Sequence, residues 1–174
     1  MSHTKLCASC KNGAITSQTT IDTDDTQLPR WLRECDYVQR FIDNSNSFRQ
    51  KHPTNATMEV AIKVSPKLAG RSVLFWATKP SLGVFRVPDA RNAYGDFSNS
   101  GVSYVKKDGS VIFKVRCPQI YSVIPFGRQK RAVFPRHIHW IISNEKKTNW
   151  VAPVMTTNIL CNSSKDIVEN AIRT

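Results

Sequence analysis

The chain has 174 residues, of which 40% are hydrophobic, so it is long enough for one domain with a substantial core. No apolar run reaches the length of a membrane-spanning helix, and the N-terminus lacks the apolar centre of a secretory signal peptide. Five cysteines are an odd number, which argues against a complete set of disulfides and for reduced thiols. We therefore expect an intracellular, cytoplasmic protein without a transmembrane segment, or a component of a particle assembled inside a cell.

The formal net charge of +12 is concentrated in the second part of the chain. Residues 1–54 contain seven Lys or Arg and six Asp or Glu, whereas residues 55–174 contain eighteen and seven, so the net charge is +1 in the first segment and +11 in the second. This surplus favours an anionic partner: a nucleic acid, a phospholipid surface or an acidic protein. A soluble domain that is merely cationic is the alternative, because the charges are scattered rather than clustered.

The first 54 residues are expected to form an N-terminal arm. Residues 1–27 are polar without a sustained period and are expected to form a leader that is mobile or draped over the main domain. From Pro29 onward, apolar residues recur at steps of three and four, which predicts an amphipathic helix that ends near Asn44. Its apolar face needs a partner, either the chain's own main domain or a neighbouring subunit. That face consists of Trp31, Leu32, Cys35, Val38, Phe41 and Ile42.

Residues 55–174 are expected to form an antiparallel β-sandwich. Short runs rich in β-branched and aromatic residues alternate with turn residues, which is typical of such folds. Asp108-Gly109 predicts a hairpin, because glycine accepts the positive φ that a tight turn requires. A short helix is predicted over residues 163–174. The predicted strands are 58–64, 72–78, 102–107, 110–116 and 137–143.

His137 and His139 are separated by one residue within the last of these strands. Residues i and i+2 of a strand point to the same face, so both imidazoles are able to reach one metal ion. Two histidines on a solvated strand face are the alternative, because a single His-x-His pattern is a weak signal.

Further motifs flank the histidines in a fixed order. They are a strand containing Trp76, the Asp108-Gly109 hairpin, Pro118 with Tyr121, Pro135 with His137-Ile138-His139, and Thr156-Thr157-Asn158. This order resembles that of the intradiol ring-cleavage dioxygenases, the catechol and protocatechuate enzymes, and the resemblance covers roughly residues 57–161.

The resemblance implies a β-sandwich that holds a mononuclear Fe(III) through two tyrosinates and two histidines. Ferric ion deprotonates phenols, and the phenolate charge in turn stabilises the ferric state. In the family the metal binds a catechol and prepares it for reaction with O2, while an arginine before the histidines stabilises anionic charge. Carried over to this chain, the pattern assigns Tyr121, His137 and His139 as ligands.

Two positions depart from the family's pattern. The Gly-x-Tyr motif that supplies the first tyrosine is matched by a triplet ending in Phe85, and the arginine position is Phe134. Arg136 directly precedes His137 and is expected to face away from both imidazoles. Tyr94 becomes a fourth ligand only if the loop that carries it is rebuilt. Without Tyr94, the remaining tyrosine and the two histidines would suit Cu(II) or Zn(II), or would form a polar cluster without metal.

Two smaller features remain open. Cys7 and Cys10 form half of a zinc-binding pattern, but no second Cys-x-x-Cys follows, so two free thiols are the alternative. Cys117 and Cys161 are expected to be small core residues. A basic loop, Arg128, Lys130 and Arg131, lies between Tyr121 and the histidines, where it would attract an anionic substrate or partner, or simply be solvated.

Three functions follow from the sequence. The first is a non-catalytic structural or binding subunit of a larger assembly, such as a virion, since Phe85 and Phe134 replace a ligand and the arginine. In this role the N-terminal helix contacts a protein partner or a second copy of the chain. The second is a working non-haem Fe(III) dioxygenase that cleaves catechol-type aromatics, with Tyr94 as fourth ligand. The third is a basic nucleic-acid-binding module, although no known nucleic-acid-binding motif is present.

Overall fold

The computed structural model describes residues 15–18, 36–80, 84–124 and 129–159. These residues are mostly strand and most strand pairs are antiparallel, so the expectation of an all-β fold is confirmed at this level. The elements are β1 Ile15–Gln18, α2 Asp36–Asn44, β2 Met58–Lys63, η2 Pro66–Leu68, β3 Ser72–Ala77, β4 Val84–Arg86, α3 Ala90–Tyr94, β5 Ser100–Tyr104, β6 Ser110–Val115, β7 Ile120–Val123, β8 Ala132–Phe134, β9 His137–Ser143 and β10 Trp150–Asn158.

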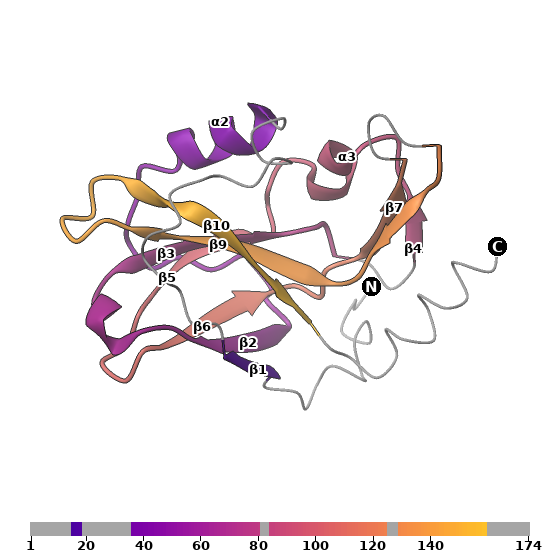
Figure 1. Ribbon diagram of the computed structural model, residues 1–174. Coiled ribbons are helices and arrows are strands. Elements are labelled where there is room, and N and C mark those ends of the chain that lie inside the picture. The colour runs from indigo at the N-terminus through magenta and orange to yellow at the C-terminus, as the bar shows by residue number, and fades with distance from the viewer. Residues whose placement is uncertain (1–14, 19–35, 81–83, 125–128, 160–174) are drawn as a thin grey trace.

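Two sheets face each other across one apolar core (Figure 1). The first sheet has the strand order β1-β2-β6, and the second has the order β10-β9-β3-β5. Aromatic rings from both sheets meet in the core: the ring centroid of Phe113 on β6 lies 5.0 Å from that of Phe75 on β3 and 6.2 Å from that of Trp140 on β9. Burying these rings together removes a large apolar area from water.

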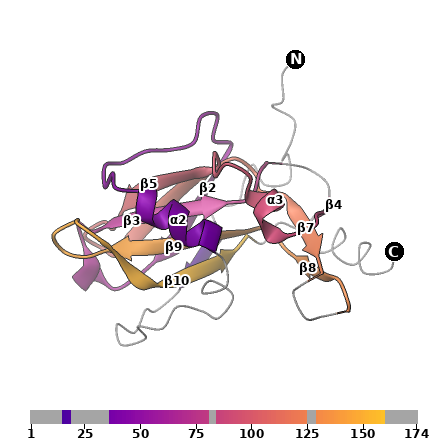
Figure 2. The same ribbon diagram turned by 90° about the horizontal axis from the view of Figure 1, so that it is seen from above.

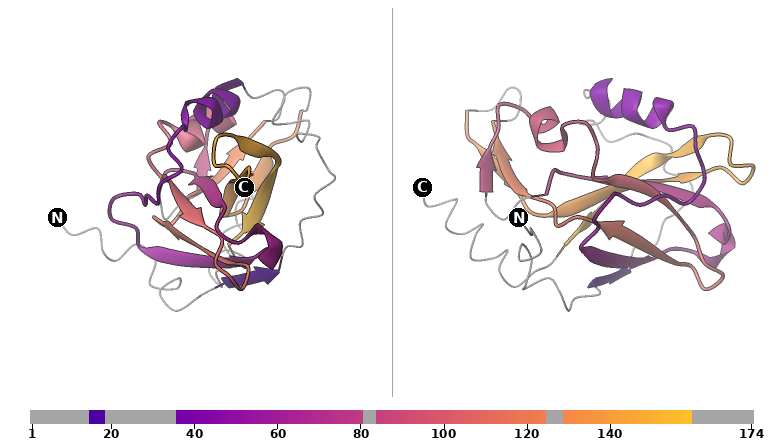
Figure 3. Two further views of the ribbon diagram at one scale, coloured as in Figure 1. Left: turned by 90° about the vertical axis from the view of Figure 1, so that its left-hand side faces the viewer. Right: turned by 180° about the vertical axis from the view of Figure 1, so that it is seen from behind.

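Helix α2 covers the opposite face of the second sheet (Figure 2). Val38 and Ile42 of α2 are buried, and the ring of Phe41 meets Trp76 of β3 edge to face at 5.5 Å. The views in Figure 3 show α2, the second sheet and the first sheet as successive layers. Both faces of β3 and β9 are therefore covered, which explains why every residue of these strands is buried rather than every second one. Within residues 36–44, the apolar stripe packs on the chain's own sheet.

A third, smaller sheet stands at one end of the molecule. Its strand order is β4-β7-β8, with β4 and β7 parallel and β7 and β8 antiparallel. Helix α3 lies beside this sheet, at the same end as the first residues of β9 (Figures 1 and 2). This end of the molecule therefore gathers the segments that carry the two histidines and the candidate tyrosines.

Several local predictions can be compared with the structure. Gly109 has a φ of 81°, and the Asp108 carboxylate accepts a hydrogen bond from the Ser110 amide, as expected of a tight hairpin. Within the expected leader, residues 15–18 form the short strand β1, which pairs in parallel with β2. That strand is not visible in a single sequence because it depends on a partner 45 residues away. Residues 29–35 and the helix predicted over 163–174 lie outside the described residues.

The prediction of reduced thiols was wrong for Cys117. This residue is disulfide-bonded and 4% exposed within the core shared by the two sheets. Cys117 is the only cysteine within the described residues, so its disulfide partner lies outside them. An odd number of cysteines excludes a complete disulfide set but allows individual pairs. Among the described residues, no helix has the length and apolarity needed to cross a bilayer.

Candidate metal centre

Two tyrosines and two histidines bring their polar atoms to one buried point. The hydroxyl oxygen of Tyr94 lies 2.9 Å from Nε2 of His137 and 2.9 Å from Nε2 of His139. The same oxygen lies 3.5 Å from the hydroxyl of Tyr121. All four side chains are between 3% and 6% exposed. The structure thus brings together the three ligands expected from the motifs and the fourth that required a rearranged loop.

The histidines are presented by the central strand β9. His139 pairs in register with Trp76 on β3 and with Thr156 on β10, so the backbone is held on both sides. His137 and His139 share one face because they are two residues apart, and their ring centroids are 4.7 Å apart. The sequence-based placement of both imidazoles at one point agrees with this geometry.

Tyr94 is delivered by the short helix α3, which has strong local signals at both ends. The Asp89 side chain accepts a hydrogen bond from the Asn92 amide at the N-terminus. Gly95 ends the helix with a φ of 60°, and its amide donates to the Arg91 carbonyl. The last turn is also tied to the body of the protein, because the Ala93 carbonyl accepts from the Lys79 amide. These contacts fix the end of α3 next to the histidines.

Tyr121 is held within the third sheet. Strand β7 places Tyr121 opposite Phe85 of β4 and opposite Phe134 of β8. The rings of Tyr121 and Phe134 stack with centroids 5.0 Å apart and an interplanar angle of 16°. The position expected to carry an arginine therefore provides an apolar wall for one of the tyrosines.

Each imidazole has a hydrogen-bond partner at Nδ1, on the side away from Tyr94. Nδ1 of His137 lies 2.6 Å from the Pro135 carbonyl oxygen, which only accepts, so this nitrogen carries the proton. Nε2 of His137 therefore presents a lone pair toward Tyr94. Nδ1 of His139 lies 2.8 Å from the Thr156 hydroxyl, which is able to donate or accept.

The histidines are neutral at physiological pH. Burial lowers the pKa of His137, and burial together with the proximity of His137 lowers the pKa of His139 well below its ordinary value of 6.5. The Tyr94 hydroxyl lies within hydrogen-bond distance of both Nε2 atoms. A cation at this point would contact Nε2 of both histidines at once, each in its neutral Nδ1–H form.

The separations between the donor atoms suit a first-row transition metal. Two ligands that are each about 2.0–2.1 Å from one ion lie about 2.9 Å apart at a right angle and about 3.4 Å apart at the tetrahedral angle. The observed separations of 2.9, 2.9 and 3.5 Å are close to these values, and the two shorter ones are also those of ordinary hydrogen bonds. Phenol oxygens combined with imidazoles suit a hard, highly charged ion, because phenol must lose its proton to bind. The four residues therefore fit ferric iron.

Aromatic residues surround the four side chains. Phe97 stacks on Phe41 of α2 with centroids 4.2 Å apart, and it also stacks on Tyr94 at 5.9 Å. Trp76 lies 5.7 Å from the ring of His139 and is fully buried. This cover keeps water away from the donor atoms and strengthens electrostatic interactions between them. Phe97 occupies positive φ at 57°, and no motif in the sequence indicates its role in covering the centre.

The remaining candidate residues lie elsewhere. Arg136 is 2% exposed, and burial lowers its pKa. In the basic loop, Arg131 donates to the Ser122 carbonyl and Lys130 is exposed, whereas Arg128 lies outside the described residues. The possible zinc ligands Cys7 and Cys10 also lie outside the described residues. Within them, no group of three or more His, Cys, Asp or Glu side chains would hold a metal, so tyrosines are needed to complete the histidine pair.

Comparisons with known proteins do not assign a family. No protein-family model matches the chain, and no curated protein matches it.

Proposed function

We propose that the chain is a β-sandwich of the intradiol dioxygenase type that holds a mononuclear ferric ion and cleaves catechol-type aromatics with O2. The observation that carries this proposal is the Tyr94 hydroxyl, 2.9 Å from the Nε2 atoms of both His137 and His139. It replaces the tyrosine that the sequence lacks at Phe85. With Tyr121 it completes the ligand set that the motif resemblance implies.

Each residue of the centre has a defined task in this proposal. Tyr94 and Tyr121 release their phenolic protons to solvent on metal binding, and their negative charge offsets that of the cation. His137 and His139 bind through Nε2 because Pro135 and Thr156 hold the opposite nitrogen. When bound, ferric iron supplies a Lewis acid that binds the two oxygens of a catechol and makes its ring reactive toward O2. Both atoms of O2 would enter the product as the bond between the two hydroxyl-bearing carbons of the catechol breaks. The reaction therefore requires no separate reductant.

A second function is favoured by Phe134. An apolar ring stacks on Tyr121 where the related enzymes carry a guanidinium that stabilises anionic charge. This replacement supports a scaffold that has lost ring cleavage and acts as a structural or binding subunit of a larger assembly.

The purified full chain tests these functions. Ferrous ammonium sulfate is added without oxygen, the sample is exposed to air, and the visible spectrum and iron content are measured. The dioxygenase requires about one iron per chain, a strong tyrosinate-to-iron absorption band, and O2 uptake when catechol is added. Coloured protein without O2 uptake supports the non-catalytic subunit. Colourless protein that binds no iron contradicts the metal centre. Tyr104→Phe, which alters an exposed tyrosine outside the centre, serves as the matched control.

A further inference from the structure

A cationic surface lies at the end of the molecule opposite the candidate metal centre. Three turns lie at this end: η2, the β5–β6 turn and the β9–β10 turn (Figures 1 and 2). Backbone hydrogen bonds join the first two, since the Gly70 amide donates to the Val105 carbonyl and the Val64 amide donates to the Gly109 carbonyl. The basic residues on or beside these turns are Lys63, Lys67, Arg71, Lys106, Lys107, Lys146 and Lys147.

Few acidic groups offset this charge. Asp108 and Glu145 are the acidic residues on the same turns, and the Asp108 carboxylate is engaged by the amide and hydroxyl of Ser110. None of the seven cations has an ion-pair partner within 4 Å in the part of the chain that the structure describes, where Lys114 with Glu59 is the pair observed. The surface is therefore strongly positive and available to an anionic partner.

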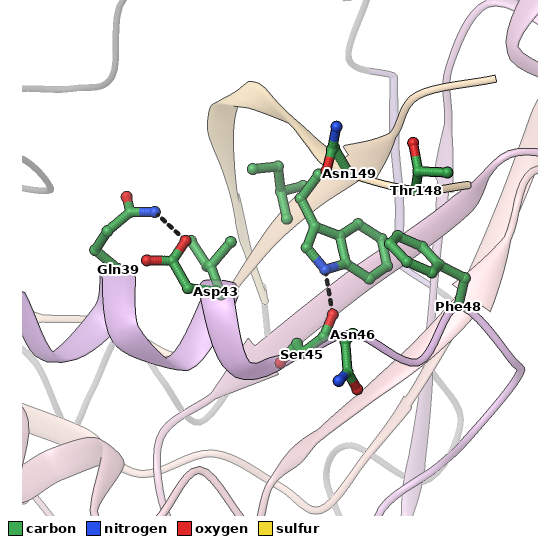
Figure 4. Close-up of a pocket in the computed structure, with 10 residues that line it drawn as sticks. Gln39, Asp43, Ser45, Asn46, Phe48, Thr148 and Asn149 are labelled. Carbon is green, nitrogen blue, oxygen red and sulfur yellow. Dashed lines mark hydrogen bonds between the residues drawn. The ribbon is translucent and has the colours of Figure 1, made fainter. Parts of the chain in front are cut away.

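A pocket of about 410 Å³ opens beside this surface, between the end of α2 and the β9–β10 turn (Figure 4). Phe48 and Trp150 form an aromatic wall with ring centroids 4.5 Å apart. Asn46 and Asn149 contribute exposed side-chain amides that have no hydrogen-bond partner within the described residues. The lining also includes Asp43, whose carboxylate accepts a hydrogen bond from the Gln39 side chain, and among the described residues it includes no basic one. An aromatic wall with amide and carboxylate groups has the chemistry that binds the polar edge of a planar ring such as a nucleobase.

The pocket and the cations are directly connected. The Phe48 carbonyl accepts a 2.7 Å hydrogen bond from the Ser72 hydroxyl, and Ser72 follows Arg71 in sequence. Ser72 also pairs with Tyr104, whose side chain is 44% exposed at the end of edge strand β5. On the other side, Asn149 belongs to the turn that carries Lys146 and Lys147. The pocket is thus linked to the turn that carries Lys146 and Lys147 and, through Ser72, to Arg71 and the exposed ring of Tyr104.

We propose that this surface binds single-stranded nucleic acid, with the phosphates on the cations and a base in the Phe48–Trp150 pocket. Single-strand binders combine a positive track for the backbone with aromatic platforms for the bases. A phospholipid surface or an acidic protein would use the cations but would not need an aromatic pocket lined by amides. The site is separate from the candidate metal centre and does not depend on iron.

Fluorescence anisotropy with the full chain tests this proposal. The probes are a fluorescein-labelled oligothymidylate and an abasic oligodeoxynucleotide of equal length, which keeps the phosphates and removes the bases. We expect the oligothymidylate to bind at least about fivefold more tightly, because stacking of even one base contributes that much. If the abasic strand, or phosphatidylserine vesicles, bind as tightly as the oligothymidylate, the surface recognises only charge and the proposal is wrong.

Variants assign the binding to this end of the molecule. Lys146→Gln/Lys147→Gln should flatten the plot of log affinity against log salt by about 1.4, because each single-strand phosphate contact contributes about 0.7. The matched control, Arg86→Gln/Arg91→Gln, removes two exposed cations at the other end and should leave the slope unchanged. Asn149→Ala should weaken oligothymidylate binding about fivefold without affecting the abasic strand. Equal slopes for both double variants, or no effect of Asn149→Ala, would overturn the proposal.

Discussion

Replacing Tyr94 by phenylalanine removes one oxygen atom from the centre and leaves the aromatic ring in place. In the folded protein that oxygen lies 2.9 Å from Nε2 of both histidines. Tyr94 as a whole is 4% exposed. The substitution therefore leaves the ring packing against Phe97 intact and changes only the polar contacts. It separates the chemistry of the centre from the packing around it.

The expected loss differs between the metal-free and the iron-loaded protein. Without metal, the hydroxyl has one proton and donates one hydrogen bond to a buried imidazole, so its removal should lower the free energy of unfolding by about 1–3 kcal/mol. With iron, a ligand is also lost. Removing even an outer-shell partner weakens metal binding by up to about 100-fold, so losing Tyr94 should cost a further ~2.7 kcal/mol or more of metal-linked stability.

Denaturant unfolding of wild type and Tyr94→Phe, each with chelator and with iron, measures both quantities. Tyr104→Phe is the control, because it removes a hydroxyl from an exposed ring outside the centre and should change neither value. For a chain of this size, each kcal/mol lost from the free energy of unfolding lowers the melting temperature by about 2–4 °C. Equal losses with and without iron would refute the reasoning, since Tyr94 would then be only a hydrogen-bonding group of the core.

Three further results are expected. Thr156→Val should weaken iron binding about 10- to 100-fold, because the Thr156 hydroxyl contacts Nδ1 of His139. Thr156 is exposed, so the substitution should have little effect on folding. Unchanged iron affinity in a metal titration would argue against a positioning role. Burial lowers the pKa of His137 and His139 in the folded state, so the unfolded chain binds more protons below pH 6.5 and stability without metal should fall as the pH drops, by at most about 2.7 kcal/mol per pH unit. Denaturant unfolding in chelator follows this, and a stability that is flat or rises toward about pH 5 is incompatible with it. Gly101→Ala should destabilise the fold by about 1–3 kcal/mol, because its Cβ would lie 2.3 Å from the Lys51 carbonyl oxygen; wild-type stability in the same assay would show that the backbone yields easily.

The sequence by itself determined the strands that carry their own signals. The predicted runs 58–64, 72–78 and 110–116 correspond to β2, β3 and β6 within one residue, and the run 137–143 corresponds to β9. The Asp108-Gly109 turn and the common face of the two histidines also follow from local rules, because turn geometry and the two-residue period of a strand depend only on neighbouring residues.

The tertiary structure decided which side chains complete the centre. The end of α3, 43 residues before His137, brings Tyr94 to the imidazoles, and this approach depends on long-range contacts such as that between Ala93 and Lys79. Strand β1 and the packing of α2 over β3 likewise need partners far along the chain. Sequence motifs identify candidate metal ligands that stand at the expected spacings. A candidate ligand that comes from another loop is found only in the folded structure, because no local pattern encodes the distance between separate segments.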